Sequence, residues 1–512
     1  MIPLLIPSRF FRTSPLVLAG AFLATLTTLA RAEVALPGIF TDHMVLQRDQ
    51  PVAVWGTATP GESVTVRFAT ESQSTVADSS GKWSLRLGAL PASAEGREFT
   101  VIASNTITLT DVLVGEVWLC SGQSNMEKPL GIRAGQTPCD NSIAEIAAAA
   151  HPLLRLYQFP RNGNASEGDS TLRWLACSPA SVDKSHFSAS GYYFGRELLR
   201  ELKVPVGLIH SSVGGTRIEP WTPPEAYSNR PALADIASAV AADQPYKKVK
   251  VGSLYASMIR PLSPYTLRGF IWYQGESNLM LDDSLVYTEK MRALIEGWRA
   301  AWGLPEAAFY HVQLAPYAYS RRKLPDHLSV YALPRFWEAQ DRSLAIPHTG
   351  QAVINDTVTR SSDIHPTNKL DVGLRLARAA LRQTYGRSDI VASGPIFASL
   401  EKRDSAIALR FDASEGLAAR GGGALAGFAI AGENHQFVPA VAELSGRDVL
   451  VSSPSVAAPV AVRYAWHETA AGNLANASGL PARAFRTDDW PVETTRALAP
   501  EELAAPPAPK TP

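Results

Sequence analysis

The 512-residue chain has no excess of charge of either sign. Lysine plus arginine and aspartate plus glutamate number 48 each, so the formal net charge is zero. A protein whose main partner is nucleic acid or an anionic membrane surface normally carries a basic excess. Beyond residue 32, no segment approaches the ~20 apolar residues that span a bilayer. We therefore expect neither nucleic acid nor a membrane as a partner.

The chain also has few cysteines and none of the usual metal motifs. Its three cysteines are Cys120, Cys139 and Cys177, and an odd number leaves at least one thiol unpaired, with a Cys139–Cys177 bridge left open. There is no H-E-x-x-H and no paired C-x-x-C. The run GGGALA at 421–426 lacks the strand–turn–helix unit of a dinucleotide site. We expect no metal and no cofactor.

The first 32 residues are typical of an export signal. Arg9 and Arg12 precede an apolar stretch over 15–29, and residues 30–32, Ala-Arg-Ala, offer a small-x-small cleavage pattern. The mature chain would begin at Glu33, with no cysteine after the cut to carry a lipid. We expect a soluble protein that is exported to a periplasm or secreted.

Length and pattern divide the rest of the chain into parts. A chain of this size exceeds what one core supports, so several domains are expected. Short alternating strands over 33–110 predict a small N-terminal β-sandwich-like domain, and residues 387–490 return to a β pattern. The Ala/Pro-rich residues 491–512 predict a disordered tail.

The middle part, residues 111–386, alternates apolar runs with segments of helical period. The runs are VLVGEVWLC, VPVGLIH, GFIWY, FYHVQLA and QAVIN. Apolar residues lie on one face of a helix over 291–302 and of another over 370–381. Strands in alternation with helices predict an α/β domain with a parallel sheet that is covered on both faces.

Ligands bind an open parallel sheet beyond the carboxyl ends of its strands. The residues after four of the apolar runs are Gly122-Gln123-Ser124-Asn125, Val213-Gly214-Gly215-Thr216, Gln274-Gly275-Glu276-Ser277-Asn278, and Asp356 followed by Asp363-Ile364-His365-Pro366. Together they supply a hydroxyl, glycine-rich turns, amides and an imidazole with nearby carboxylates. These groups are what acyl transfer requires.

Ser124 is the candidate nucleophile and His365 the candidate base of this set. A serine hydroxyl needs a base within hydrogen-bonding distance, and the developing oxyanion needs N–H donors that are already directed at it. The alternatives are an ordinary strand-ending turn and a histidine without a chemical role. Residue 126 is Met, so Ser124 does not fit the G-x-S-x-G pattern of α/β-hydrolases.

Several motifs resemble the sialate O-acetylesterase family, a branch of the SGNH hydrolases. They are GEVWLCSGQSNM, GGTRIEPW, WYQGESN and DIHPTNK, in the order of the family, and the likeness covers most of residues 34–490. The resemblance implies a flavodoxin-like three-layer α/β/α domain that carries a serine esterase and needs no cofactor. It also implies that Ser124 is the nucleophile and His365 the general base.

The resemblance further implies oxyanion donors from the Ser124 backbone, from Gly214 and Gly215, and from the amide of Gln274 or Asn278. The acid partner of His365 stays open. The family places an aspartate three residues before the histidine, where this chain has Ser362, and Asp363 is only two before. The alternatives to Asp363 are Glu276, Asp356, or a site that works largely as a Ser–His dyad.

The expected reaction is hydrolysis of an acetyl ester on a sugar hydroxyl through an acetyl-serine intermediate. A sialic acid is the first expected substrate, and Arg217 is a candidate to bind its carboxylate, although a structural role for Arg217 fits equally. The alternative substrates are acetylated xylan or another polysaccharide. An alternative of another class is a carbohydrate-binding protein without catalysis. The oligomeric state is open.

Overall fold

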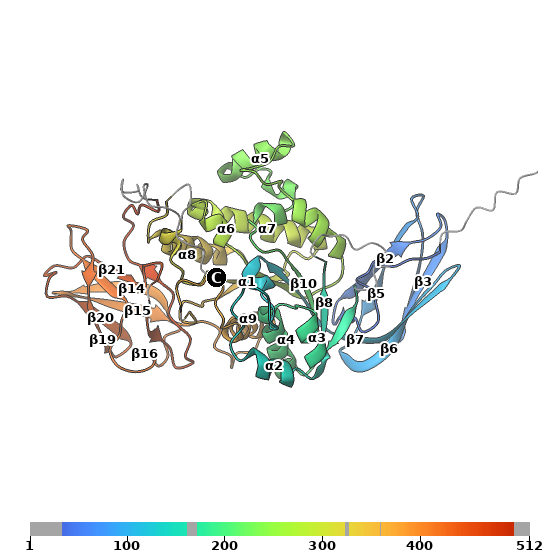
Figure 1. Cartoon of the computed structure of the whole chain (residues 1–512), viewed down its shortest axis with the longest axis horizontal. Coiled ribbons are helices and arrows are strands. Elements are labelled where there is room, and N and C mark those ends of the chain that lie inside the picture. Colours follow the sequence, from blue (N-terminus) through green and yellow to red (C-terminus); the bar gives the residue numbers. More distant parts are fainter. Residues whose placement is uncertain (1–32, 161–171, 323–326, 359, 470, 496–512) are drawn as a thin grey trace, which may run out of the picture.

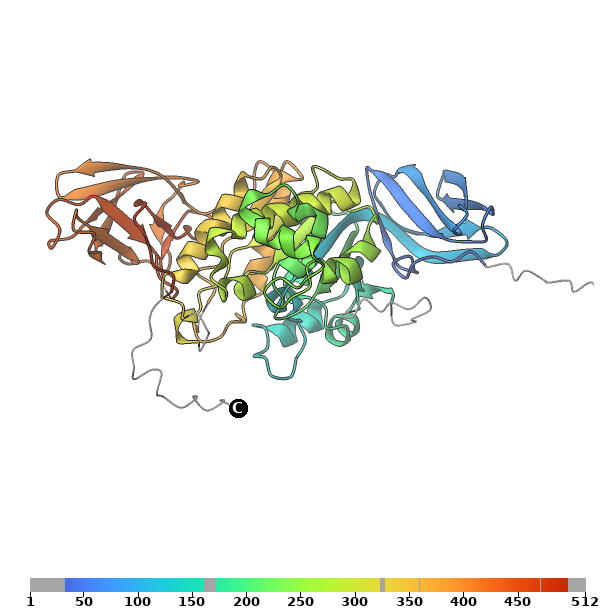
Figure 2. The same cartoon turned by 90° about the horizontal axis from the view of Figure 1, so that it is seen from above.

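The computed structural model of the protein describes residues 33–160, 172–322, 327–358, 360–469 and 471–495. An N-terminal β part and a C-terminal β part lie at opposite ends of an elongated molecule, with the α/β part between them (Figures 1 and 2). The predicted export signal over 1–32 lies outside the described residues, as does the predicted tail beyond residue 495.

The central part is built on one twisted sheet. Its strands are β7 (Thr106–Gly122), β8 (His151–Gln158), β9 (Trp174–Cys177), β10 (Val206–Ser212), β11 (Gly269–Tyr273), β12 (Ala308–Val312) and β13 (Thr349–Ala352). They lie in the order β13-β12-β11-β7-β10-β8-β9. All neighbours are parallel except β9, which is antiparallel to β8, so the sheet is mixed rather than purely parallel. An antiparallel strand at such an edge is common in doubly wound folds.

Helices cover both faces of this sheet (Figure 1). The helices of the central part, within the described residues, are α1 (Ser124–Glu127), α2 (Ser142–Ala148), α3 (Pro179–Lys184), α4 (Ala189–Leu202), α5 (Ala234–Ala241), α6 (Glu276–Leu279), α7 (Tyr287–Trp302), α8 (Ala332–Arg342) and α9 (Leu370–Gln383). Of these, α5 projects away from the sheet at the top of Figure 1. On one face Trp298 of α7 packs edge-on against Phe270 of β11, with ring centroids 5.4 Å apart. On the other face Trp118 of β7 packs against Phe194 of α4 at 5.1 Å. The predicted helix–strand alternation is confirmed.

The N-terminal part shares a strand with the central sheet. Its own strands are β1 (Val45–Gln47), β2 (Pro51–Thr57), β3 (Ser63–Phe68), β4 (Glu71–Val76), β5 (Lys82–Ala89) and β6 (Ser93–Ile102). The first half of β7 pairs antiparallel with β6 up to Val114. From Glu116 onward β7 pairs in parallel with β10. The predicted boundary at residue 110 therefore falls inside one continuous strand.

The C-terminal part is antiparallel throughout its described sheets. Its strands are β14 (Ile396–Arg403), β15 (Ala406–Asp412), β16 (Ala418–Ala419), β17 (Phe428–Ala431), β18 (Val438–Pro439), β19 (Val441–Ser445), β20 (Asp448–Ser452), β21 (Ala461–Tyr464), β22 (Leu474–Ala475) and β23 (Phe485–Arg486). Arg486 Nε contacts Glu338 Oε1 of α8 at 2.7 Å. Farther along, Thr494 Oγ1 donates to Asp282 Oδ2 at 2.6 Å, so the start of the predicted disordered tail packs on the central part.

The three cysteines are buried and carry no disulfide. Cys139 Sγ donates to the Pro129 carbonyl at 3.3 Å, and Cys177 Sγ donates to the Ala149 carbonyl at 3.5 Å. The Cys139–Cys177 bridge, which the sequence left open, is not formed in this structure.

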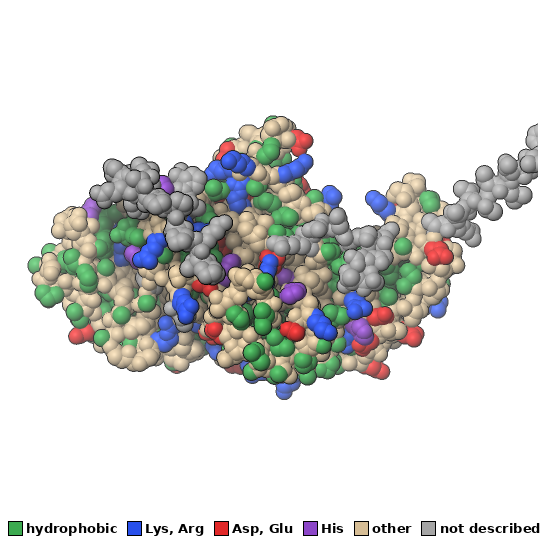
Figure 3. Space-filling model, in the orientation of Figure 1, with side chains coloured by type: hydrophobic (Ala, Val, Ile, Leu, Met, Phe, Trp, Pro, Cys, Tyr) green, Lys and Arg blue, Asp and Glu red, His purple; other side chains and the backbone are tan. Residues whose placement is uncertain are grey.

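The distribution of charge on the surface follows the equal numbers of acidic and basic residues. On the face in Figure 3, Lys and Arg side chains lie scattered among Asp and Glu. No helix in the described ranges is both long enough and apolar enough to pass through a bilayer.

Candidate active site

The middle strand of the sheet ends in the predicted serine turn. The chain first fills the sheet on the β10 side of β7 and then crosses over to the β11 side. The carboxyl end of the strand where the order reverses is the usual ligand site of such a sheet. This end is Gly122, and Ser124, two residues on, begins the short helix α1.

Hydrogen bonds join the turns that follow the three middle strands. The Val213 N–H, after β10, donates to the Gly122 carbonyl at 3.2 Å, and the Gln123 N–H donates to the Tyr273 carbonyl of β11 at 3.0 Å. Gln123 Oε1 also accepts from Gln274 Nε2 at 3.1 Å. Gly122 has φ 140°, and a Cβ there would lie 2.2 Å from the Tyr273 oxygen, so this close approach requires glycine.

The glycine turn after β10 lies against Ser124. A Cβ on Gly214 would lie 3.2 Å from the Ser124 Cβ, so glycine is what allows the contact. The Gly214 N–H donates to Glu127 Oε2 at 3.0 Å. Gly215 follows with φ 74° and is exposed. The predicted oxyanion turn thus lies next to the predicted nucleophile. One N–H group of this turn, that of Gly214, donates to the Glu127 carboxylate.

The base-bearing segment reaches the same edge from the loop between β13 and α9. Asn125 Nδ2 donates to the Ile364 carbonyl at 2.9 Å. The residue after Ser124 therefore contacts the residue before His365. Ser124 and His365 are both half-buried. Within the described chain, no hydrogen bond links the Ser124 hydroxyl to the His365 imidazole.

The surroundings of His365 favour its neutral form. Burial, and after it the positive charges of Lys369 and Lys128, lower the pKa of His365 to about 4, while Asp363 acts in the opposite direction. Below that pH the imidazole is protonated, and above it the imidazole is free to accept a proton. The imidazole is therefore neutral and able to accept a proton at neutral pH, and the same lowered pKa makes it a weaker base than a free histidine.

The three candidate carboxylates have different partners. Asp363 Oδ1 accepts the backbone N–H of His365 at 2.8 Å. Glu276 Oε1 accepts from Asn125 Nδ2 at 2.5 Å. Asp356 pairs with Arg375, Nη2 to Oδ2 at 2.7 Å, and with Arg420 of the C-terminal part. In the described chain, none of the three forms a hydrogen bond with the imidazole, and Asp363 alone binds the His365 segment.

Both candidate amide donors are engaged inside the protein. Gln274 Nε2 donates to Gln123 Oε1, to the Thr216 carbonyl at 3.2 Å and to Asn278 Oδ1 at 2.8 Å. Asn278 Nδ2 donates to Asp283 Oδ2 at 2.8 Å and is near Glu219. Buried carboxylates and carbonyls need such donors, which explains the orientation of both amides. Their hydrogen bonds join the turns of the site to one another.

Arg217 lies in the same buried network. Its guanidinium donates to the Tyr246 carbonyl at 2.8 Å and lies 3.7 Å from Glu219. The residue is only 7% exposed. The structure therefore favours the structural role for Arg217 over contact with a substrate carboxylate.

Three neighbours of the site were missed as functional candidates from the sequence. Asn125 joins the serine turn to the histidine loop, Glu127 binds the glycine turn, and Lys369 Nζ donates to Asn125 Oδ1 at 2.7 Å. Asn125 and Lys369 stand inside the GQSN and DIHPTNK motifs. A lysine at the start of a helix gives no sequence signal that it is buried.

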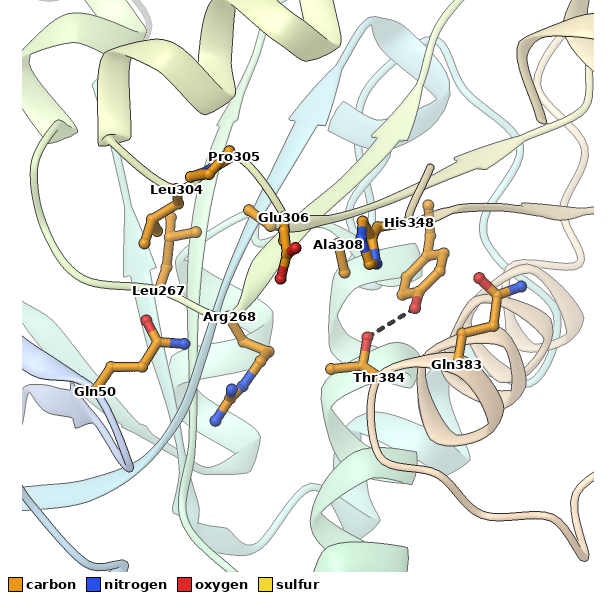
Figure 4. Close-up of a pocket in the computed structure, with 12 residues that line it drawn as sticks. Gln50, Leu267, Arg268, Leu304, Pro305, Glu306, Ala308, His348, Gln383 and Thr384 are labelled. Carbon is orange, nitrogen blue, oxygen red and sulfur yellow. Dashed lines mark hydrogen bonds between the residues drawn. The ribbon is translucent and has the colours of Figure 1, made fainter. Parts of the chain in front are cut away.

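Of two hollows in the central part, only the smaller one is near the candidate site. The cavity in Figure 4, of about 570 Å³, is lined by residues such as Arg268, Glu306 and His348, which precede β11, β12 and β13. It therefore lies at the amino ends of these strands, away from Ser124. A smaller hollow of about 250 Å³ lies beside the histidine loop and includes Arg360 and Asp363.

Metal binding has no support in the side chains that the structure describes. Within the described ranges, no three or more His, Cys, Asp or Glu side chains lie close enough to hold a metal ion. The groups gathered at the edge are a hydroxyl, an imidazole and backbone N–H groups, which are those of a serine esterase.

Known proteins resemble this chain over most of its length. A family model described as carbohydrate esterase, sialic acid-specific acetylesterase, matches residues 114–382. The human sialate O-acetylesterase is 31% identical over 401 residues, which are 70% of this chain and 73% of that protein. The mouse sialate O-acetylesterase is 29% identical over 422 residues, covering 70% and 75%. A carbohydrate acetylesterase from Xanthomonas citri matches with a TM-score of 0.78 and 38% identity, over 89% of this chain and 100% of that one.

Proposed function

The chain belongs to the carbohydrate esterase family of sialic acid-specific acetylesterases, and on this premise we propose that Ser124 and His365 carry out its reaction. It is a carbohydrate acetylesterase of the sialate O-acetylesterase type. The observation that carries the residue assignment is the 2.9 Å hydrogen bond from Asn125 to Ile364, the neighbours of Ser124 and His365. This bond supports a shared reaction centre at the carboxyl end of β7.

The proposed chemistry has two halves. Ser124 Oγ attacks the acetyl carbonyl while His365 accepts the hydroxyl proton. The bond between the acetyl carbon and the sugar oxygen then breaks, and the imidazolium protonates the departing sugar. In the second half His365 deprotonates a water molecule that attacks the acetyl-serine. Acetate leaves, and the proton returns to Ser124.

We propose that the oxyanion is bound by the backbone N–H groups of Gly214, Gly215 and Ser124. Loss of one such donor typically raises a barrier by about 3 kcal/mol. Glu127 accepts the Gly214 N–H in the free enzyme, so this carboxylate must release it when the oxyanion forms. Gln274 and Asn278 are weaker candidates, because each amide nitrogen donates to buried acceptors, whereas the Gly214 turn lies against the Ser124 side chain.

We further propose that the site works largely as a Ser–His dyad. Asp363 binds the backbone of the His365 segment rather than the ring, and its role is to hold the shape of that loop. Glu276 and Asp356 are engaged by Asn125 and by arginines, respectively. In the described chain, none of the three carboxylates therefore accepts a hydrogen bond from the imidazole ring, which is what supports the dyad.

Sialic acid is the substrate that the names of the mammalian relatives favour. The name of the Xanthomonas citri carbohydrate acetylesterase specifies no sugar, so an acetylated polysaccharide stays the second candidate. Parallel assays of acetate release from O-acetylated sialic acid and from acetylated xylan distinguish them. We expect faster release from the sialic acid, and faster release from xylan would reverse the order.

The test of the nucleophile and the base uses matched variants. Ser124→Ala and His365→Ala should each lower kcat/KM for nitrophenyl acetate by at least about 10⁴-fold with an unchanged circular dichroism spectrum. The controls are Ser79→Ala and His348→Ala, both exposed and outside the site, which should keep full activity. Turnover retained by Ser124→Ala would remove the nucleophile assignment, and a mild loss in His365→Ala would point to another base.

The finer fold class, the domain limits and the destination are proposals as well. The strand order and the helices on both faces support a flavodoxin-like SGNH domain over 111–386 between β domains over 33–110 and 387–490.

Residues 1–32 support export to a periplasm or to the medium. N-terminal sequencing of the protein from an exporting host should give Glu33 first, and an intact Met1 would contradict export.

A further inference from the structure

Beneath the serine turn, the side chains of Asn125, Glu276 and Lys369 form a buried polar cluster. They come from α1, from α6 and from the residue just before α9. Lys369 Nζ donates to Asn125 Oδ1 at 2.7 Å, and Asn125 Nδ2 donates to Glu276 Oε1 at 2.5 Å. Lys369 is 1% exposed, Asn125 1% and Glu276 2%.

The cluster is connected to the serine turn, the histidine loop and the end of β11. Asn125 Nδ2 also donates to the Ile364 carbonyl at 2.9 Å, next to His365. Lys369 Nζ lies 5.0 Å from the ring centroid of Tyr273, the last residue of β11. One ammonium group therefore contacts the residue after the nucleophile and the end of the neighbouring strand, while Asn125 continues the connection to the histidine loop.

Burial of a lysine side chain at this position is unfavourable in free energy. Desolvation of an ammonium group costs several kcal/mol, and an apolar side chain of similar size is often as stable or more stable. Burial lowers the pKa of Lys369 to about 7, with Lys128 acting in the same direction and with Cys139, Glu276 and Asp363 acting against it. Lys369 is consequently charged below neutral pH, which includes the range in which His365 titrates. A cation that acts on a base changes the pH at which the base works, which an apolar residue does not do.

We propose that Lys369 is a positioning residue of the esterase site, which holds Asn125 between the serine turn and the histidine loop and carries a charge that acts on the His365 imidazole four residues before it. This inference rests on the proposed roles of Ser124 and His365. It adds a residue that touches neither the acetyl group nor the sugar and acts through its neighbours.

The charges around His365 determine in which direction the loss of the Lys369 charge changes the pKa of His365. Lys369, Lys128 and Arg133 disfavour the imidazolium form of His365, and Asp363 favours it. Removal of the Lys369 charge should therefore raise the pKa of His365. Activity requires the neutral imidazole, so the acid limb of kcat/KM should move to higher pH by about one pH unit.

The experiment compares Lys369→Met, Lys369→Arg and wild type. Two readouts are measured: the pH profile of kcat/KM for nitrophenyl acetate, and the NMR titration of His365 with ¹³C-labelled histidine, assigned by the signal lost in His365→Gln. Lys369→Met should show an acid limb and a ring titration about one pH unit higher, and kcat/KM at neutral pH at least about tenfold lower. Lys369→Arg keeps the charge and should keep the wild-type titration. Lys402→Met, an exposed lysine of β14, is the matched control.

The two readouts separate the possible failures. An unchanged ring titration in Lys369→Met would overturn the charge role, whatever the activity. A shifted ring titration with an unmoved acid limb would leave the role of Lys369 intact and would contradict His365 as the base. If Lys369→Met does not fold, Asn125→Ser removes the connection and keeps the lysine. Wild-type kcat/KM in that variant would overturn the positioning role.

Discussion

At the scale of single residues, Asp363 is the carboxylate whose role the geometry defines most sharply. It accepts the His365 backbone N–H at 2.8 Å, which fixes the loop and does not touch the ring. When an aspartate orients the catalytic imidazole, its replacement by asparagine lowers the rate of the enzyme by about 10⁴-fold. An aspartate that only accepts a backbone N–H can be replaced by asparagine, because the amide oxygen accepts the same bond.

Asp363→Asn should therefore keep kcat/KM within about tenfold of wild type, and Asp363→Ala should lose more, because the loop then loses its acceptor. Steady-state kinetics with nitrophenyl acetate measure both variants. A loss near 10⁴-fold in Asp363→Asn would show that the carboxylate turns to the ring when substrate binds, which would restore the triad.

The sequence predicted the position of some residues of the site better than their partners. Ser124 and His365 follow apolar runs, and parallel strands bring their carboxyl ends to one edge, so their proximity could be predicted. Gln274 and Asn278 were predicted as oxyanion donors, but their nitrogens satisfy buried acceptors that no pattern reveals. Lys369 was missed because nothing in its neighbourhood along the chain indicates burial.

At the scale of elements, the end of β7 depends on one backbone approach. Gly122 has φ 140°, and its Cα hydrogen faces the Tyr273 carbonyl of β11, where a Cβ would lie 2.2 Å from the oxygen. The neighbouring Gln123 N–H donates to that same carbonyl. A side chain at residue 122 would push the two strand ends apart and displace Ser124 with them.

Gly122→Ala should destabilise the protein by about 3 kcal/mol and abolish most esterase activity. Thermal unfolding and kcat/KM measure the two effects. The matched control is Gly135→Ala, where φ is also positive, at 76°, but no atom lies within 4 Å of the added Cβ. The control measures the cost of adding a Cβ at a positive φ where no atom is close, and equal losses in both variants would contradict the role of the close approach.

The elements themselves were largely predictable, and their ends were less so. The residues of GFIWY form β11, and the helical pattern over 291–302 lies within α7. The pattern changes near residue 110 from alternating to continuously apolar, which suggested a domain boundary. In the structure the same point lies within β7, where one strand passes from a half-exposed sheet to a sheet that is covered on both faces.

At the scale of the whole molecule, one ion-pair cluster connects the C-terminal part to the central part. Asp356, in the loop after β13, is held by Arg375 of α9 and by Arg420 of the C-terminal part. The Arg375 side chain is 9% exposed and that of Arg420 is 37% exposed. A buried pair that loses one partner costs far more than a pair near the surface.

Arg375→Ala should lower stability by about 3 kcal/mol, because the buried Asp356 carboxylate then keeps, among the described residues, only the more exposed Arg420 as a partner. Arg420→Ala should cost about 1 kcal/mol or less, because water reaches that end of the cluster. Urea unfolding followed by tryptophan fluorescence gives both values. Equal losses would contradict the difference in burial, and a separate early transition in Arg420→Ala would show that the C-terminal part unfolds independently.

The attachment of the C-terminal part could not be predicted, because it depends on single long-range pairs. Glu338 with Arg486 and Asp356 with Arg420 join positions far apart in the chain, and charged residues on a helix or in a loop are normally solvated. The composition of this part indicated β structure correctly. Its docking surface is visible only in three dimensions.

The shared strand β7 makes the N-terminal part a stiff extension of the catalytic sheet. A module on a flexible linker can pivot, and its motion is lost before it reaches its neighbour. A torque on the N-terminal sheet would instead be transmitted along a single run of backbone that ends two residues before Ser124. If the N-terminal part bound a large substrate, the continuous strand would fix the orientation of that substrate relative to Ser124.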